Sequence, residues 1–279
     1  MDIIQILKDE LQINRSQAEA AVKLIDEGNT IPFIARYRKE ATGSLNDEVL
    51  RNLDERLKYL RNLEERKEQV INSIREQEKL TPELEKKILA ASTLVAVEDL
   101  YLPYRPKRKT RASIAKEKGL EPLANLVLMQ LTKTPLLKEA EHYISEEKGV
   151  LTAEEALNGA KDILAERIAE TAEYRTYIRK ATFQEGSLDS SARDGNAESV
   201  YEMYYNFTEP VKKAAGHRIL ALNRGEKEKI LTVKITAPEE KILRYLEKKV
   251  ITRENPETAR VLREVTEDSY KRLISPAIE

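Results

Sequence analysis

Cations and tyrosines gathered between positions 101 and 112 are the residues of this sequence best suited to a specific chemistry. The run reads Tyr-Leu-Pro-Tyr-Arg-Pro-Lys-Arg-Lys-Thr-Arg-Ala. Residues 101–118 hold seven cations and one anion, a local charge of +6 in a chain whose net charge is -1. Cations along a backbone that prolines keep extended can follow a phosphate backbone, and tyrosine rings can stack on bases. The segment therefore predicts a nucleic-acid contact, with these candidate residues: Tyr101, Tyr104, Arg105, Lys107, Arg108, Lys109 and Arg111.

Alternatively, the same segment can have a structural role within the chain. Its arginines and lysines can pair with acidic helices of the same chain, and its tyrosines can pack as anchors between those helices. Cations buried against carboxylates would indicate an intramolecular clasp, whereas a row of cations facing solvent would favour nucleic-acid binding. From the sequence, both alternatives stay open.

A second, shorter basic set consists of Arg36, Arg38 and Lys39. The spacing places Arg36 and Lys39 three residues apart, on one face of the helix expected there. These cations either contact a phosphate or pair with two glutamates nearby in the sequence, Glu27 and Glu40.

A third set lies in residues 217–226, which are typical of a short amphipathic turn of helix closed by Gly225. Its two arginines, Arg218 and Arg224, are further candidate nucleic-acid contacts. A tightly packed junction between domains has the same pattern, so a structural role is the alternative here as well.

Several catalytic chemistries are not encoded. The chain has no cysteine, which excludes disulfides, thiolate nucleophiles and zinc sites with sulfur ligands. Its two histidines, His142 and His217, lie outside any nucleophile-elbow pattern, and its glycines never take the spacing of a phosphate-cradling loop. Adjacent acids arise by chance among 49 carboxylates. We therefore expect no catalytic residues, no bound metal and no cofactor.

Helices must position the basic sets, because the sequence has only nine glycines and is 35% charged. Packed or long helices typically have this composition. We predict a mainly α fold, a multi-helix bundle with a long central helix at about 45–78, where leucines recur at helical spacing without an interrupting glycine or proline. Before it, a capping box of Ser16 with Glu19 and end signals at Gly28 and Thr30 predict short helices joined by tight turns.

The chain is predicted to divide into an N-terminal helical domain, residues 1–184, and a smaller helical domain, residues 197–279. Residues 185–196 are rich in Gly, Ser, Asp and Asn, so we expect a loop and domain boundary there. The one convincing strand-like run lies near 229–236 and predicts a short β element. The capping pair Ser275-Pro276, so close to the end, predicts a sequence that stops inside a longer protein.

The sequence carries neither a basic leader nor an apolar stretch of the roughly 18 residues that would span a bilayer. Together with the absence of cysteine, this predicts a cytoplasmic protein without a membrane partner.

The three basic sets resemble motifs of the Tex family, bacterial transcription accessory proteins named for toxin expression, which are similar to a eukaryotic transcription elongation factor. One position departs from the pattern, because Gly216 stands where a serine is expected before the His-Arg pair. The resemblance rests on residues 30–40 with Thr42-Gly43, on residues 98–112, and on His217-Arg218, Leu220-Ala221 and Arg224-Gly225-Glu226.

The resemblance implies a largely helical N-terminal region that starts with a helix-turn-helix-like element. It also implies further parts of a longer protein: an RNase H-like domain, helix-hairpin-helix elements and a C-terminal OB-fold RNA-binding domain. None of these further parts lies in the present sequence.

Together, the basic sets and the resemblance predict a non-enzymatic, nucleic-acid-binding transcription accessory protein. This chain would be its helical scaffold, with auxiliary surfaces that contact phosphates. RNA, DNA or both are the expected partners, and RNA polymerase and the missing C-terminal domains of the same chain are further candidates. The alternative is a protein-interaction scaffold that docks RNA polymerase or its own downstream domains without touching nucleic acid.

Overall fold

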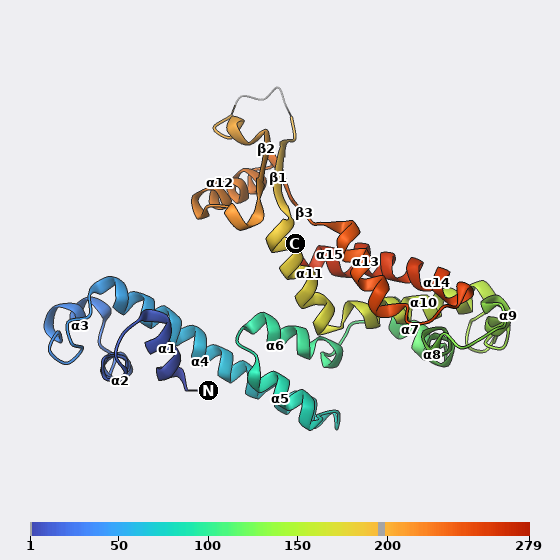
Figure 1. Ribbon diagram of the computed structural model, residues 1–279, viewed down its shortest axis with the longest axis horizontal. Helices are drawn as coiled ribbons and strands as arrows, with labels where there is room; N and C mark the ends of the chain where they lie inside the picture. The colour runs from blue at the N-terminus through green and yellow to red at the C-terminus, as the bar shows by residue number, and fades with distance from the viewer. Residues whose placement is uncertain (1, 195–198) are drawn as a thin grey trace. The chain divides into compact units, whose positions relative to one another are not determined.

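The computed structural model describes residues 2–194 and 199–279, and it is mainly α-helical with one small sheet (Figure 1). This confirms the predicted fold class. The chain divides into two compact units, Met1–Tyr104 and Arg105–Glu279. We refer to them as unit 1 and unit 2. The division therefore falls at the start of the basic run rather than at 185–196, where the sequence predicted a boundary.

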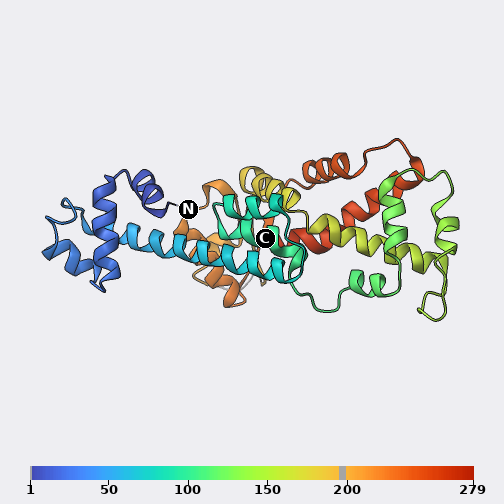
Figure 2. The same ribbon diagram turned by 90° about the horizontal axis from the view of Figure 1, so that it is seen from below.

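Unit 1 is organised along one long helix, α4 (Asp47–Glu76), whose 30 residues confirm the predicted central helix (Figure 2). Asn46 caps its first turn, because its side chain accepts from the backbone N–H of Val49. The remaining elements of unit 1 are α1 (Ile3–Leu11), α2 (Arg15–Asp26), α3 (Ile31–Tyr37), α5 (Pro82–Ala90), α6 (Leu94–Tyr101) and the 3-10 turn η1 (Leu102–Tyr104).

Helix α4 buries a single apolar stripe along its length, as the leucine spacing predicts. Its first half packs against α1, α2 and α3, and its second half packs against α5 and α6. Lys67 lies within the buried stripe and is only 2% exposed. Its ammonium donates to the carbonyl oxygen of Leu89, at 2.9 Å, and lies 2.9 Å from a carboxylate oxygen of Glu64. A buried lysine needs such partners, so Lys67 ties α4 to the C-terminal end of α5.

The turn between α2 and α3 follows the predicted signals. Gly28 has a left-handed backbone, φ +84°, which a residue without a side chain adopts at little cost. Thr30 then precedes α3, whose second residue is Pro32. The capping box of α2 is formed by Asn14 and Gln17, and not by Ser16 and Glu19. A short glycine-containing turn between two helices suits the helix-turn-helix-like element, which stays a prediction.

Unit 2 is a helical core with a small sheet inserted into it. Its elements are α7 (Arg111–Glu117), α8 (Glu121–Met129), α9 (Leu136–Glu141), α10 (Ala153–Ala169), α11 (Ala172–Glu185), β1 (Ser187–Ala192), η2 (Glu202–Tyr204), β2 (Asn206–Pro210), η3 (Val211–Lys213), α12 (Gly216–Lys227), β3 (Leu231–Thr236), α13 (Glu239–Val250), α14 (Pro256–Asp268), the π-helical turn η4 (Ser269–Ile274) and α15 (Ser275–Ile278).

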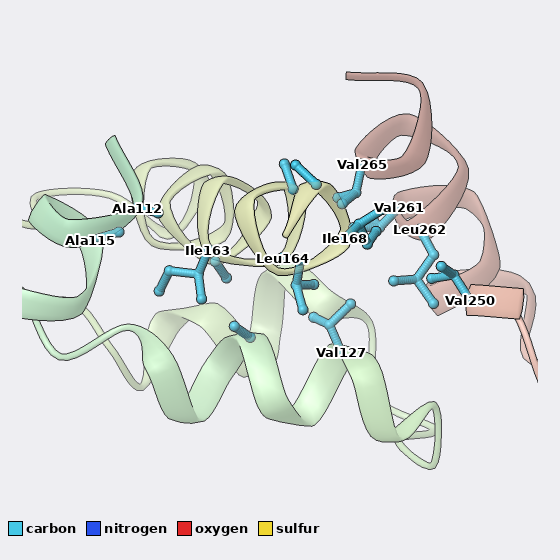
Figure 3. Close-up of a cluster of buried hydrophobic side chains, with 14 of the residues drawn as sticks. Ala112, Ala115, Val127, Ile163, Leu164, Ile168, Val250, Val261, Leu262 and Val265 are labelled. Atoms are coloured by element: carbon cyan, nitrogen blue, oxygen red, sulfur yellow. The ribbon is translucent and has the colours of Figure 1, made fainter. Parts of the chain in front are cut away.

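Helix α10 lies at the centre of this core (Figure 3). It packs against α7, α8, α9 and α14, and buries residues on several of its faces. In the close-up, Ile163 and Leu164 of α10 lie between residues of α7 and α8, and Ile168 points towards Val261 of α14. A helix with buried residues on more than one face is typical of a core position, and most of the residues packed on it are aliphatic.

The sheet has the strand order β2-β1-β3 and is antiparallel throughout. Strand β3 confirms the β element predicted near 229–236. Strand β1 corrects the predicted loop over 185–196, of which residues 195 and 196 lie outside the described part of the chain. Its sequence, Ser-Leu-Asp-Ser-Ser-Ala, has little intrinsic strand preference, but its central position pairs it on both edges.

The residues after the sheet return to the helical core. Helix α13 and helix α14 place Ile242, Leu246, Val261 and Leu262 in the same apolar cluster as α10. The sheet and α12 therefore form an insertion between α11 and α13, and lie together on one side of unit 2 (Figure 1). Residues 242–274 thus contribute to one core with residues 112–181, whereas the sheet and α12 surround an apolar cluster of their own.

Close packing of α10 on the α7–α8 connection predicts a cost for any side chain at Gly159. A Cβ atom there would lie 2.3 Å from Cδ1 of Leu120, which is itself fully buried. We expect Gly159→Ala to lower the free energy of unfolding by about 1–3 kcal/mol through overpacking, measured by urea denaturation. Gly216→Ala is the matched control, because a Cβ there meets nothing within 4 Å, and it should stay within about 0.5 kcal/mol of the parent. Equal stability of the two variants would contradict this packing.

Candidate nucleic-acid interface

The predicted basic strip is not one continuous extended segment. Tyr101 ends helix α6, and the next three residues form the 3-10 turn η1. Residues 105–110 have no regular structure, and Arg111 begins α7. We call residues 105–111 the basic segment, and all of it belongs to unit 2.

The two tyrosines that precede the basic segment are structural anchors. Tyr101 is 8% exposed, and its hydroxyl lies 2.9 Å from the hydroxyl of Ser73 on α4. The guanidinium of Arg66 lies 5.5 Å from the centre of its ring. Tyr104 is half-buried against the same apolar cluster. The prediction that Tyr101 stacks on bases is therefore wrong, because the packing of α6 against α4 covers its ring.

One lysine of the basic segment faces inward. The ammonium of Lys107 lies 3.2 Å from a carboxylate oxygen of Glu166, on α10, and also pairs with Glu170, the residue that caps the C-terminal end of α10. These two carboxylates are 13% and 15% exposed. The ammonium of Lys116, on α7, lies 3.7 Å from Glu166. We call Lys107, Lys116, Glu166 and Glu170 the acid clasp. For Lys107, the structure thus agrees with the alternative in which cations of the segment pair with acids of the same chain.

The end of the basic segment is fixed by Thr110. Its hydroxyl donates to Glu166, at 3.0 Å, and accepts from the backbone N–H of Ser113, also at 3.0 Å. The hydroxyl of Ser113 in turn accepts from the backbone N–H of Thr110, at 2.8 Å, which completes a capping box at the start of α7. Lys107 and Thr110 thus pin the segment to α10 at two points.

Burial dominates the electrostatics of the acid clasp. Desolvation raises the pKa of Glu170 above its ordinary value of 4.5, although the hydrogen bond and the charge of Lys107 act in the opposite direction. The neighbouring charge of Glu166 raises it further. Glu166 lies in the last turn of α10 and Glu170 caps its C-terminal end, so the two carboxylates come close enough to share the ammonium of Lys107.

The other cations of the basic segment face solvent. Arg105 and Arg108 are exposed and form no ion pair or side-chain hydrogen bond within residues 2–194 and 199–279. Lys109 lies 3.7 Å from Glu117, an exposed pair that water screens to little net attraction. Arg111 is exposed too, but its charge helps the hydrogen bonds of Arg272 to lower the pKa of Asp268. Arg105, Arg108 and Lys109 are therefore the cations most available to a ligand.

The second basic set differs from its prediction in geometry. Helix α3 ends at Tyr37, so Arg38 caps the helix and Lys39 lies beyond it. Arg36 and Lys39 therefore do not share a helix face. All three cations are exposed, and within the described residues none of them pairs with Glu27, Glu40 or another acid. The structural alternative of local ion pairs thus finds no support in this part of the chain.

The third basic set is engaged locally. Arg218 lies 2.8 Å from Glu209, a nearly buried residue of β2, and so ties α12 to the sheet. Arg224 pairs with Glu228 at 3.0 Å. Gly225 lies inside α12 instead of closing it, and it allows close contact with Leu231 of β3. Arg218 is therefore less available to a ligand than the exposed cations of the other two sets, whereas Arg224 is 76% exposed and its pair with Glu228 is screened by water.

Two features of these surfaces were not recognised from the sequence. The carboxylates of the acid clasp are one. Their signal is a pair of glutamates four residues apart, Glu166 and Glu170, at the largely apolar C-terminal end of α10. The other is an exposed aromatic pair on α3, Phe33 and Tyr37, beside the cations of the second set. Its signal is two rings four residues apart in a segment that also carries cations.

Within residues 2–194 and 199–279, no three or more His, Asp or Glu side chains are grouped so that they could hold a metal ion. In the same residues, no helix combines the length and the apolar character needed to cross a bilayer.

Two protein families match this chain. Residues 1–75 match the family described as Tex-like protein N-terminal domain, and residues 132–275 match the family described as Tex central region-like. Together the matches cover much of unit 1 and most of unit 2. The basic segment lies between them.

Named relatives extend the comparison. The chain is 48% identical over 278 residues to the uncharacterized protein YdcI of Bacillus subtilis, covering 99% of this chain and 39% of the relative. It is 44% identical over 235 residues to the transcriptional accessory protein Tex of Neisseria gonorrhoeae, covering 84% and 31%. It is 31% identical over 293 residues to S1 RNA-binding domain-containing protein 1 of Pongo abelii, covering 99% and 29%. The chain thus spans less than two fifths of the length of each of these relatives.

The raised pKa of Glu170 predicts a distinctive pH dependence of stability. A carboxyl group whose pKa is higher in the folded state stabilises the fold below its ordinary pKa, 4.5, and this contribution is lost as the pH rises through the folded value. Glutamine cannot titrate. We therefore expect the difference in free energy of unfolding between Glu170→Gln and the parent to move in favour of the variant as the pH rises from 4.5 to neutrality. Urea denaturation across this range measures the difference, and a constant difference would contradict the raised pKa.

Proposed function

Starting from the conclusion that this chain belongs to the Tex family, we propose that it is a nucleic-acid-binding part of a transcription accessory protein. The matches over residues 1–75 and 132–275 confirm the family resemblance that the sequence motifs indicated. In this proposal the basic segment contacts phosphates through Arg105, Arg108 and Lys109, and the helices of unit 2 position it.

The observation that carries the proposal is that some residues of the basic segment are bonded to α10 while other residues of the segment are exposed to solvent. Lys107 and Thr110 hold the segment against α10, while Arg105, Arg108 and Lys109 remain exposed. A ligand therefore meets cations on a backbone that is already fixed. Fixing the segment in advance lowers the entropy that is lost on binding, and each phosphate contact releases condensed counterions.

The names of the relatives agree with this role. The relative from Neisseria gonorrhoeae is named a transcriptional accessory protein, and that from Pongo abelii is named for an RNA-binding domain. For this chain we propose RNA, DNA or both as partners. RNA polymerase and further domains of a complete protein are proposed as additional partners, with the cytoplasm as the place of action. We propose a binding role without catalysis, since the exposed cations suit phosphate contacts and need no reacting group.

A second candidate function is a protein-interaction scaffold without direct nucleic-acid contact. The observation that favours it is the internal pairing of several predicted contact residues. Lys107 is held by Glu166 and Glu170, and Arg218 is held by Glu209. In this alternative the exposed cations of the basic segment meet acidic protein surfaces instead of phosphates.

Charge reversal in the basic segment distinguishes the two functions. We expect Arg108→Glu combined with Lys109→Glu to weaken binding of the chain to labelled oligonucleotides by about tenfold or more. It should also reduce the slope of log affinity against log salt concentration by about 2, because two phosphate contacts are lost. Fluorescence anisotropy across a salt series measures both quantities.

The matched control reverses two exposed cations of α13, Arg244→Glu with Lys248→Glu, which changes the net charge equally. It should leave the salt slope close to that of the parent. A parent chain that binds no oligonucleotide, or equal losses in the two double variants, would remove the basic segment as the binding site and favour the scaffold.

A further inference from the structure

Helix α3 presents aromatic rings and cations together on the surface of unit 1. Tyr37 is 70% exposed and Phe33 is 38% exposed. Arg36, Arg38 and Lys39 are exposed beside them in the sequence. We call these five residues the α3 patch.

The rings of the α3 patch form one platform. Phe33 and Tyr37 are one helical turn apart, and their ring centres are 5.3 Å apart with planes inclined at 45°. The guanidinium of Arg38 lies 5.7 Å from the centre of the Phe33 ring, within the range of a cation–π contact. An aromatic face and a guanidinium plane that both remain open to solvent offer two kinds of stacking surface.

The platform is held by buried residues and backbone contacts around it. Ile34, between the two rings in the sequence, is fully buried in the core of unit 1. Thr42 is also fully buried, and its hydroxyl donates to the carbonyl oxygen of Arg38, at 3.2 Å. Gln17 of α2 donates to the carbonyl oxygen of Gly43, at 3.0 Å, where φ is +58°. The chain between and after the exposed rings is therefore fixed, so a ligand meets a preformed surface.

The charges of the α3 patch indicate what it binds. Three cations accompany the two rings, and within residues 2–194 and 199–279 none of the three has an ion-pair partner. Glu40 is the one acid among residues 31–40. Open rings with unneutralised cations fit a polyanion that also carries flat, unpaired faces. Single-stranded nucleic acid has both properties, whereas the base faces of a duplex are already stacked.

We propose that the α3 patch is a stacking site for single-stranded nucleic acid. Unpaired bases stack on Tyr37 and Phe33, and Arg36, Arg38 and Lys39 contact the adjoining phosphates. The proposal deepens the proposed function and rests on it, since it assigns a preference for single strands to a surface separate from the basic segment. RNA and DNA share the required chemistry, so the experiment includes both.

The experiment compares variants of the whole chain by anisotropy with labelled oligouridylate, oligothymidylate and a DNA duplex of the same length. Tyr37→Ala removes the more exposed ring, which contributes little to the core because most of it faces solvent. Tyr37→Phe keeps the ring and is the conservative variant. Phe183→Ala removes another exposed aromatic ring, in unit 2, and is the matched control.

We expect Tyr37→Ala to weaken binding to single strands by about tenfold, the effect of losing one base–aromatic stack, and to leave duplex binding unchanged. The salt slope should stay the same, because no cation is lost. Tyr37→Phe and Phe183→Ala should bind as the parent does. A fluorescent aminopurine base in the oligonucleotide should be quenched by the parent and less so by Tyr37→Ala.

Other outcomes overturn the proposal. If Tyr37→Ala binds single strands as the parent does, or loses duplex binding to the same extent, the α3 patch is not a stacking site. In the first case, an acidic protein becomes the class of partner to test for the patch. Failure of the proposed function looks different: the Arg108→Glu, Lys109→Glu variant then binds as the parent does while Tyr37→Ala still loses single strands. A parent chain that binds no nucleic acid ends both proposals.

Discussion

Two carboxylates one turn apart at the C-terminal end of α10 must be neutralised, and the position of the basic segment depends on how this is done. Glu166 and Glu170 repel each other and are largely withdrawn from water, so each needs a cation or a hydrogen-bond donor. Lys107 supplies the cation to both, and Thr110 supplies a donor to Glu166. The same contacts that satisfy α10 therefore bring the basic segment onto its surface and fix the start of α7.

The chain is nearly neutral, so exposed cations without partners have to arise from an uneven distribution of charge. Many surface cations are paired at helical spacing, as Arg51 is with Asp47 and Lys271 is with Glu267. Such pairs contribute little stability, but the opposite charges within each pair largely cancel at a distance. Against this background the basic segment and the α3 patch are local sources of positive potential, which is how a protein with a net charge of -1 can attract a polyanion.

The sequence predicts several of the helices and one strand, but not the tertiary contacts between these elements. The long helix α4 and the strand at 231–236 follow from local signals, and the structure confirms them. Strand β1 could not be predicted, because its small polar residues become a strand only through pairing with β2 and β3. The return of α13 and α14 to the core of α10 depends on contacts between residues about 100 positions apart, which hydrophobic periodicity cannot show.

For the candidate site too, the sequence predicts the location of the cations but not the contacts that they make. The composition of residues 101–112 marks the basic segment, yet whether each cation is free depends on acids more than 50 residues away in the sequence, as Lys107 with Glu166 shows. Tyr101 and Tyr37 each lie within five residues of a proline and an arginine, but the ring of Tyr101 is covered by packing against α4 and that of Tyr37 is 70% exposed. Whether a tyrosine ring can stack on a base therefore depends on how the surrounding helices pack, and not on the residue type. Phosphate contacts, in contrast, tolerate an irregular backbone as long as the charges stay unpaired. The proposed phosphate contacts belong to unit 2 and the proposed stacking site to unit 1, so each depends on the packing of its own unit.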